Sequence, residues 1–162
     1  MNKKPLISVI IPVYNEATHI GRSLTSLSQQ SYQPLEVIVV DDGSTDTTKN
    51  VVKSFKSVKL LTHAHKGSGA ARNLGAQSAK GEILLFVDAD MEFEPSFIKD
   101  LVAPILNGKA KGTWTGNEQV ANWNNVWARC WNYNFGRYTS QMIGNYPGQR
   151  KVFRAILKSE FD

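Results

Sequence analysis

Short apolar stretches recur along the first two thirds of the chain, separated by segments in which apolar and polar residues mix. Residues 6–13, 35–40 and 83–87 are nearly continuous runs rich in Val, Ile and Leu. Such runs are typical of strands that are buried on both faces of a sheet. Residues 58–62 are a further predicted strand.

The segments between these runs have the spacing of helices. Ile20, Leu24 and Leu27 recur at intervals of four and three residues, which predicts an amphipathic helix. Strand and helix therefore alternate four times with short connections. This alternation predicts an α/β fold with a mostly parallel sheet that carries helices on both faces. The further helices are predicted over residues 46–55, 67–79 and 95–105.

The last third of the chain has a different character, because it holds all four Trp residues. Trp123, Trp127 and Trp131 recur every four residues, so they would share one face of a helix. Such a face fits a protein core, a subunit interface, an acceptor groove or a membrane surface.

Composition sets broad limits on the protein. Its 162 residues correspond to a single domain. With 19 Lys and Arg against 14 Asp and Glu, the net charge of +5 suits anionic partners such as phosphorylated ligands. The single cysteine, Cys130, excludes an intrachain disulfide and a Cys-based metal site, and it fits a reducing compartment.

Acidic residues follow the second and fourth predicted strands. These are Asp41 and Asp42, and then Asp88 and Asp90. Ligands of open parallel sheets bind outside the carboxyl ends of the strands, and carboxylates crowded there repel one another. We therefore predict that Asp88 and Asp90 hold a divalent cation, Mg²⁺ or Mn²⁺, which would bridge a diphosphate and stabilise it as a leaving group. The alternative is that both belong to a solvated turn.

Asp41 continues its strand directly, so we predict that it accepts an N–H group of a nucleotide base. Asp42 and Ser44 suit turn and helix-cap chemistry. Three lysines of the following helix share one side, which we interpret as a solvated face: Lys49, Lys53 and Lys56.

Gly67 and Gly69 precede a helix of small residues, where backbone N–H groups would bind an anion. The alternative is tight packing of this helix on the sheet. The dinucleotide-binding pattern G-x-G-x-x-G fails, because Arg72 stands at the position of the third glycine. We expect Arg72 to face the ligand edge or a buried partner.

Four motifs in this order resemble those of the family 2 glycosyltransferases, which are inverting enzymes of the GT-A fold. The motifs are VIIPVYNE at residues 9–16, DDGSTD at 41–46, GAARNLGA at 69–76 and DAD at 88–90. Four motifs in register are far more specific than any one of them.

The resemblance implies a GT-A-type, Rossmann-like sheet within a single domain. Residues 1–110 would be the half that binds the nucleotide sugar, and residues 111–162 an incomplete, aromatic-rich start of the acceptor side. It also implies that Pro12, Tyr14 and Glu16 line the nucleotide pocket.

The same resemblance assigns the charged residues of the motifs. Asp41 would receive the base, commonly uracil, and Arg72 or a nearby residue would help to hold the nucleotide. Asp88 would lie near the ribose and the metal, and Asp90 would ligate the metal directly.

An inverting transfer requires a general base near the acceptor hydroxyl. In the family this base follows a stretch similar to residues 152–162, so we expect it beyond Asp162 and assign no catalytic residue. We expect this chain to bind a nucleotide-sugar donor and a cation, and to transfer the sugar poorly alone.

The expected acceptor is a saccharide or a lipid-linked molecule, and the expected location is cytoplasmic or peripheral to the inner face of a membrane. The alternative function is a noncatalytic module that binds a nucleotide sugar and acts through a partner chain. The partner, or a second copy in a homo-oligomer, would contact Trp123, Trp127 and Trp131.

Other classes fit the sequence less well. A phosphatase with this acidic motif needs Thr or Val where Glu92 stands, and a nucleotidyltransferase needs a Gly-rich loop where Tyr14 and Glu16 stand. We expect no nucleic-acid partner, because the aromatic residues are not interleaved with basic ones.

Overall fold

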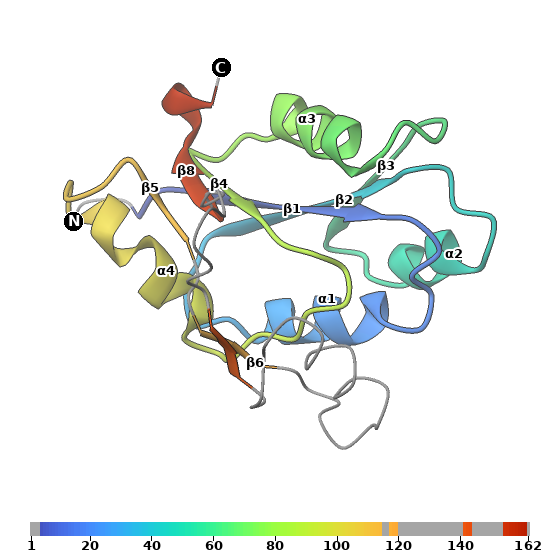
Figure 1. The fold of residues 1–162 in the computed structure, drawn as a ribbon, viewed down its shortest axis with the longest axis horizontal. Coiled ribbons are helices and arrows are strands. Elements are labelled where there is room, and N and C mark those ends of the chain that lie inside the picture. The colour runs from blue at the N-terminus through green and yellow to red at the C-terminus, as the bar shows by residue number, and fades with distance from the viewer. Residues whose placement is uncertain (1–3, 115–116, 120–140, 144–153, 162) are drawn as a thin grey trace. The chain divides into compact units, whose positions relative to one another are not determined.

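A computed structural model of the chain describes residues 4–114, 117–119, 141–143 and 154–161. Within these residues, six strands form one sheet in the order β3-β2-β1-β4-β8-β5 (Figure 1). The first four strands in the chain run parallel, and β8 lies antiparallel between β4 and β5. The predicted α/β fold with a mostly parallel sheet is confirmed. The strands are β1 (Ile7–Val13), β2 (Leu35–Asp41), β3 (Val58–Thr62), β4 (Ile83–Phe86), β5 (Gly112–Thr113) and β8 (Ala155–Leu157).

Helices cover both faces of this sheet, as the alternating pattern predicts. In Figure 1, α3 lies on one face, and α1, α2 and α4 lie on the other. The second helix begins later than predicted, because Asp46 accepts a hydrogen bond from the amide of Thr48 (2.9 Å) instead of entering the first turn. The helices are α1 (Ile20–Ser28), α2 (Thr48–Lys53), α3 (Ser68–Ser78) and α4 (Phe97–Leu106), and the turn η1 (Lys158–Glu160) follows β8.

The two faces of the sheet bury separate apolar clusters. Successive side chains of a strand point to opposite faces. Val9 and Ile11 of β1 therefore belong to the cluster that includes α1 and α4, whereas Ile10 belongs to the cluster that includes α3. All three are fully buried, and each such side chain contributes about 1.5–3 kcal/mol to the free energy of unfolding. Burial on both faces explains why the strands read as continuous apolar runs.

The helix α3 packs very closely on the sheet. A Cβ atom added at Gly75 would lie 2.5 Å from Cγ2 of Ile10 and 3.2 Å from Cγ2 of Val40. The tight-packing interpretation therefore describes the second half of this helix. Around Gly69, in its first turn, no atom lies within 4 Å of an added Cβ.

The chain divides into two compact units. Residues 1–113 and 153–162 form the unit that carries the six-stranded sheet. Residues 114–152 form the other unit, in which β6 (Asn117–Gln119) pairs antiparallel with β7 (Gln141–Ile143). The predicted aromatic face lies outside the described residues: Trp123, Trp127 and Trp131.

Substitution of two glycines of α3 tests this packing. Gly75→Ala should lower the free energy of unfolding by about 1–3 kcal/mol, because the new methyl group overlaps the buried Ile10 side chain. Gly69→Ala should raise it by about 0.4–1 kcal/mol, because open space surrounds that position. Urea unfolding of both variants gives the comparison. Equal stability of Gly75→Ala and the wild type would contradict the close seating of α3.

Candidate functional site

The carboxyl ends of β1, β2 and β4 lie next to one another in the sheet. We call this part of the sheet, with the loops that follow these strands, the carboxyl edge. Val13 ends β1 and is paired with Asp41, which ends β2. The amide of Val87 donates a hydrogen bond to β1 (3.2 Å), so Asp88 follows beside that strand. The acidic residues that the sequence places after two separate strands therefore converge here.

The loop after β1 is held by the loop after β2. Asn15 adopts a φ of 56°, a left-handed conformation that Asn tolerates better than most residues. Its amide donates to Oγ of Ser44 (2.9 Å), and its Oδ1 accepts from the amide of Thr45 (2.9 Å). The amide of Glu16 donates to Oγ1 of Thr48 (2.8 Å). These bonds fix the backbone of the segment that carries Tyr14.

Three residues were predicted to line the nucleotide pocket, and all lie in or directly after β1. Pro12 is half-buried in the strand. Tyr14 is 45% exposed, and its ring lies 4.4 Å from the ring of His65. Glu16 is half-buried, with Oε2 3.0 Å from Nδ1 of His19. The exposed aromatic ring is available for stacking against a ligand.

The side chain of Asp41 is completely buried, and one of its carboxylate oxygens accepts no hydrogen bond from the described residues. Its Oδ2 accepts a hydrogen bond from the amide of Ser44 (3.2 Å) and lies 3.8 Å from Nζ of Lys49. Its Oδ1 has no hydrogen-bond partner among the described residues. A buried polar atom without a partner costs free energy, and such atoms are rare. Oδ1 of Asp41 is therefore a candidate acceptor for an N–H group of a ligand. Lys49, whose side chain is 39% exposed, therefore contacts the site as well as solvent.

The neighbouring Asp42 has a different role from the turn and helix-cap function that its sequence suggests. Its carboxylate is buried and accepts hydrogen bonds from the amides of Lys66 (2.8 Å) and Gly67 (2.9 Å), in the loop before α3. His65 Nδ1 lies 2.9 Å from Oδ2, and His63 Nε2 lies 3.3 Å from Oδ1. Burial alone would raise the pKa of Asp42, but the two amides and the two imidazoles together lower it. Asp42 thus anchors the β3–α3 loop.

Asp88 is held by two arginines. Nη2 of Arg72 donates to Oδ1 (2.7 Å), and Nη1 of Arg154 donates to Oδ2 (3.0 Å). Burial would raise the pKa of Asp88, but the hydrogen bonds and positive charges of Arg154 and Arg72 outweigh it and lower the pKa. The expectation that Arg72 faces the ligand edge or a buried partner agrees with this contact.

Asp90 differs from the other three aspartates of the carboxyl edge. It is exposed, and it has no hydrogen bond or ion pair with any residue that the structure describes. No group of three or more His, Cys, Asp or Glu side chains that could hold a metal ion occurs within the described ranges. Mg²⁺ and Mn²⁺ are commonly held by one or two carboxylates together with substrate phosphates. A cation held by Asp90 and a phosphorylated ligand fits this arrangement, whereas both oxygens of Asp88 are already engaged.

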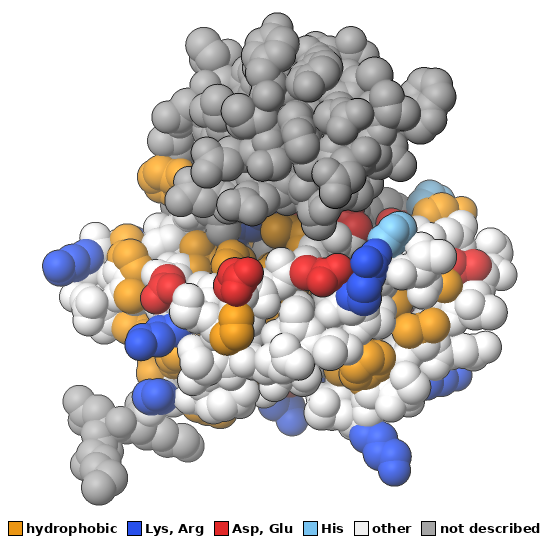
Figure 2. Space-filling model, turned by 90° about the horizontal axis from the view of Figure 1, so that it is seen from below, with side chains coloured by type: hydrophobic (Ala, Val, Ile, Leu, Met, Phe, Trp, Pro, Cys, Tyr) orange, Lys and Arg blue, Asp and Glu red, His pale blue; other side chains and the backbone are white. Residues whose placement is uncertain are grey.

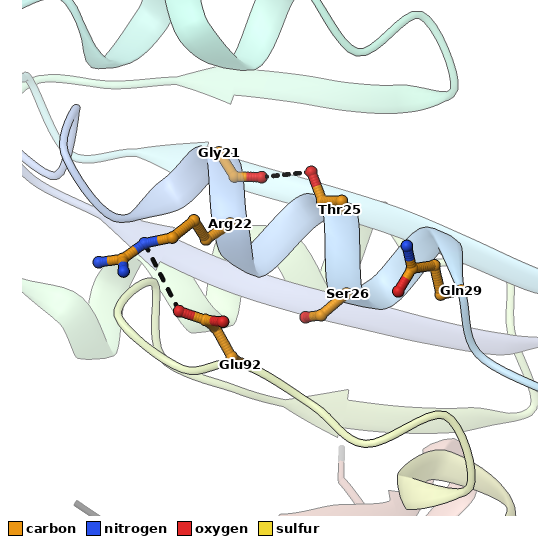
Figure 3. A pocket seen from close by; sticks show the side chains of 6 residues that line it. All are labelled: Gly21, Arg22, Thr25, Ser26, Gln29 and Glu92. Carbon is orange, nitrogen blue, oxygen red and sulfur yellow. Dashed lines mark hydrogen bonds and ion pairs between the residues drawn. The ribbon is translucent and has the colours of Figure 1, made fainter. Parts of the chain in front are cut away.

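A hollow of about 240 Å³ lies between α1 and the loop that follows β4 (Figure 3). An ion pair between Arg22 of α1 and Glu92 (3.5 Å) crosses it. Both side chains are largely exposed, and none of the predicted site residues lines the hollow. The remaining lining residues are Gly21, Thr25, Ser26 and Gln29.

On the face that carries α1, α2 and α4, the visible positive side chains of the described residues do not gather into a patch. Figure 2 shows the Lys and Arg side chains of the described residues spread singly over this face, with Asp and Glu side chains between them. A dispersed distribution of this kind gives no continuous track for a polyanion. The net charge of +5 therefore does not by itself indicate the ligand.

Two cations of the site are not assigned to it by the sequence. Arg154 lies 66 residues after Asp88 in the chain, and only the pairing of β8 with β4 brings it near. Lys49 belongs to a short helix with lysines at regular intervals, which also fits an exposed face. In both cases the role depends on a contact between distant segments of the folded chain, which a local sequence pattern does not reveal.

Comparison with known proteins assigns the chain to a family. The family model described as "Glycosyl transferase family 2" matches residues 8–158. The chain belongs to this family. An uncharacterized glycosyltransferase, YibD, of Escherichia coli K12 is 33% identical over 135 residues, which are 78% of this chain and 39% of that protein. Both the family model and this relative are described as glycosyltransferases.

Solved structures with bound nucleotides are also similar. TarS 1–349 of S. aureus in complex with UDP is 35% identical, with a TM-score of 0.60 over 65% of this chain and 33% of that one. Mannosyltransferase PcManGT from Pyrobaculum calidifontis, in complex with GDP-Man and Mn²⁺, is 32% identical, with a TM-score of 0.59 over 62% and 32% of the two chains. The GT-A-type fold is confirmed. This chain spans less than two fifths of the length of these proteins.

The described helices do not include a membrane-spanning candidate, because none of them is both long enough and apolar enough.

Substitution of Asp42 tests its anchoring role. Asp42→Asn should lower the free energy of unfolding at pH 7 by about 2 kcal/mol, because hydrogen bonds to a buried charge are lost. Since the folded pKa lies below the unfolded value of about 3.9, the contribution of the carboxylate is complete above that value and is lost as the pH falls through the folded pKa. The difference between wild type and variant should therefore shrink below about pH 4. Urea unfolding from pH 7 to pH 2 measures it.

The exposed Asp90→Asn serves as the matched control and should leave the free energy of unfolding unchanged within about 0.5 kcal/mol. A difference between wild type and Asp42→Asn that stays constant down to pH 2 would contradict the anchoring role.

Proposed function

We propose that this chain is the donor-binding part of a glycosyltransferase, which binds a nucleoside diphosphate sugar and a divalent cation at the carboxyl edge. The sugar is passed to an acceptor hydroxyl of a saccharide or lipid-linked molecule with inversion. The observation that carries this proposal is the buried Oδ1 of Asp41, which has no partner among the described residues and lies at the end of a parallel strand. Family membership supports the reaction class.

In this proposal Asp41 accepts the N3–H group of uracil. A carboxylate matches a base that offers an N–H donor, and it repels a ring nitrogen that offers a lone pair. Nζ of Lys49 lies 3.8 Å from Oδ2 and places a positive charge beside this carboxylate. UDP in the complex of the similar TarS structure supports uracil, and GDP-Man in the mannosyltransferase complex makes guanine the competing choice.

The other site residues act around the nucleotide. Tyr14 offers an exposed ring to the base, and Pro12 and Glu16 flank it from the same strand and loop. Asp88, fixed by Arg72, faces the ribose. Asp90 holds Mn²⁺ or Mg²⁺, which would neutralise the diphosphate leaving group when bound. The general base for the acceptor hydroxyl is assigned to none of these residues.

Nucleotide binding by Asp41 variants tests the base site. Wild type should bind UDP in the presence of Mn²⁺ and should bind CDP more weakly, because N3 of cytosine carries a lone pair instead of a proton. Asp41→Asn should weaken UDP binding about 10–100-fold, the loss expected for a hydrogen bond to a charged group. Because an amide also offers N–H donors, this variant should narrow the preference for UDP over CDP. Isothermal titration calorimetry with UDP, CDP and GDP measures all three affinities.

The control for this experiment is Asp100→Asn, which removes an exposed carboxylate from α4 and should bind UDP as the wild type does. If GDP binds more tightly than UDP, the base recognised by Asp41 is guanine and not uracil. Absence of binding of all three nucleotides to folded wild-type protein would overturn the proposed function.

Removal of the cation tests Asp90 separately. Chelation of Mn²⁺ should weaken UDP binding by wild type, because the diphosphate then lacks its counter-charge. Asp90→Asn should bind UDP weakly both with Mn²⁺ and with chelator, so that the dependence on the cation disappears. The measurement is the same titration in the two buffers. A full response to Mn²⁺ in this variant would show that Asp90 does not hold the cation.

A further inference from the structure

Among the described residues, Arg154 reaches the site from farthest along the sequence, and its backbone is hydrogen-bonded on both sides. It lies directly before β8, and its carbonyl accepts a hydrogen bond from the amide of Phe86 in β4 (2.7 Å). Its own amide donates to the carbonyl of Thr113 in β5 (2.8 Å). The sheet therefore fixes the backbone from which this side chain extends.

From this position Arg154 makes a contact that restricts Asp88. Arg72 holds Oδ1 from α3, and Arg154 holds Oδ2 from the position directly before β8. The two guanidinium groups approach from different elements, so together they fix the orientation of the carboxylate. The Arg154 side chain is only 22% exposed, and a largely buried cation of this kind needs an anionic partner.

The arrangement also separates two carboxylates that are two residues apart. Asp88 is compensated by two positive charges, whereas Asp90 has no partner among the described residues. A carboxylate whose oxygens both accept from arginines has little capacity left for a cation. If Arg154 were absent, Oδ2 of Asp88 would be released and one repelling positive charge would be removed.

We propose that Arg154 is a positioning residue of the donor site, which holds Asp88 toward the nucleotide and keeps it from binding the cation. This inference rests on the proposed function. In it, Arg154 acts through Asp88 and touches neither the nucleotide nor the metal. The cation site then has a single carboxylate from this motif, that of Asp90.

The proposal predicts changes of opposite sign in one variant. Arg154→Gln should bind UDP with Mn²⁺ about tenfold more weakly, because Asp88 is no longer held in place. The same variant should bind Mn²⁺ alone several-fold more tightly, because a second carboxylate becomes available. A side chain that only stabilises the fold would weaken both. Calorimetric titrations with UDP and with MnCl₂ give the two affinities.

Two further variants identify the route of the effect. Arg154→Lys keeps a charged donor for Oδ2, and it should retain most of the UDP affinity. In an Asp88→Asn background, Arg154→Gln should have no further effect on UDP binding, because the residue through which it acts has been changed. Additive effects of the two substitutions would overturn the proposal and would indicate direct contact of Arg154 with the nucleotide.

The matched control is Lys111→Gln, which removes a cation that pairs with Glu160 (2.8 Å) near the same strand and does not contact Asp88. It should leave both affinities unchanged. Thermal unfolding of each variant shows whether it is folded, and if Arg154→Gln is not, Arg154→Lys and its Asp88→Asn double variant give the decision. Unchanged UDP and Mn²⁺ affinities in folded Arg154→Gln would overturn this inference alone. Failure of the wild type to bind UDP would overturn the proposed function, and this inference with it.

Discussion

The constraint that organises this protein is the convergence of negative charge at one edge of a buried parallel sheet. Asp41 and Asp42 end one strand, and Asp88 and Asp90 follow the strand two places along the sheet. Like charges at short separation are unfavourable unless each is compensated. The fold supplies a separate set of positive or donor groups to three of them, each set from a different element: Lys49 for Asp41, the loop before α3 for Asp42, and two arginines for Asp88.

The four carboxylates differ in how many hydrogen-bond donors and positive charges surround them, and this difference separates a structural carboxylate from those proposed to bind a ligand. The carboxylate of Asp42 accepts hydrogen bonds from two backbone amides and lies near two imidazoles, which is the environment of a group that holds a loop. Asp41 keeps one buried oxygen unused, and Asp90 keeps its whole carboxylate in solvent. In the proposed function these are the positions where a ligand N–H group and a cation would complete the compensation. The order of the aspartates in the sequence does not reveal this division, because all four precede or follow turns of similar composition.

Much of the sheet unit could be predicted from the sequence, because each strand is specified by the residues of its own short segment. The runs at residues 6–13, 35–40, 58–62 and 83–87 correspond to β1, β2, β3 and β4, since strands buried on both faces need continuous apolar residues. The four motifs also marked the correct family. The predicted start of α2 was too early, because Asp46 precedes the helix and accepts a hydrogen bond from the amide of Thr48. Several polar residues in this segment could precede the helix, and the sequence does not show which one does.

The charged partners could not be predicted, because they depend on contacts between distant segments. Arg154 meets Asp88 only after β8 has paired with β4, and the short β8 has no distinctive apolar run. The role of Asp42 was missed for the same reason, since its partners lie more than twenty residues away. Roles that follow from the resemblance alone, including those of Pro12 and Glu16, stay predictions.

The most direct test of the account is a crystal structure of this chain with UDP and Mn²⁺ bound. We expect N3 of uracil to donate to Oδ1 of Asp41, Mn²⁺ to contact Asp90 and the diphosphate, and Asp88 still to accept hydrogen bonds from Arg72 and Arg154. A nucleotide bound away from the carboxyl edge, with Oδ1 of Asp41 still lacking a partner, would contradict it.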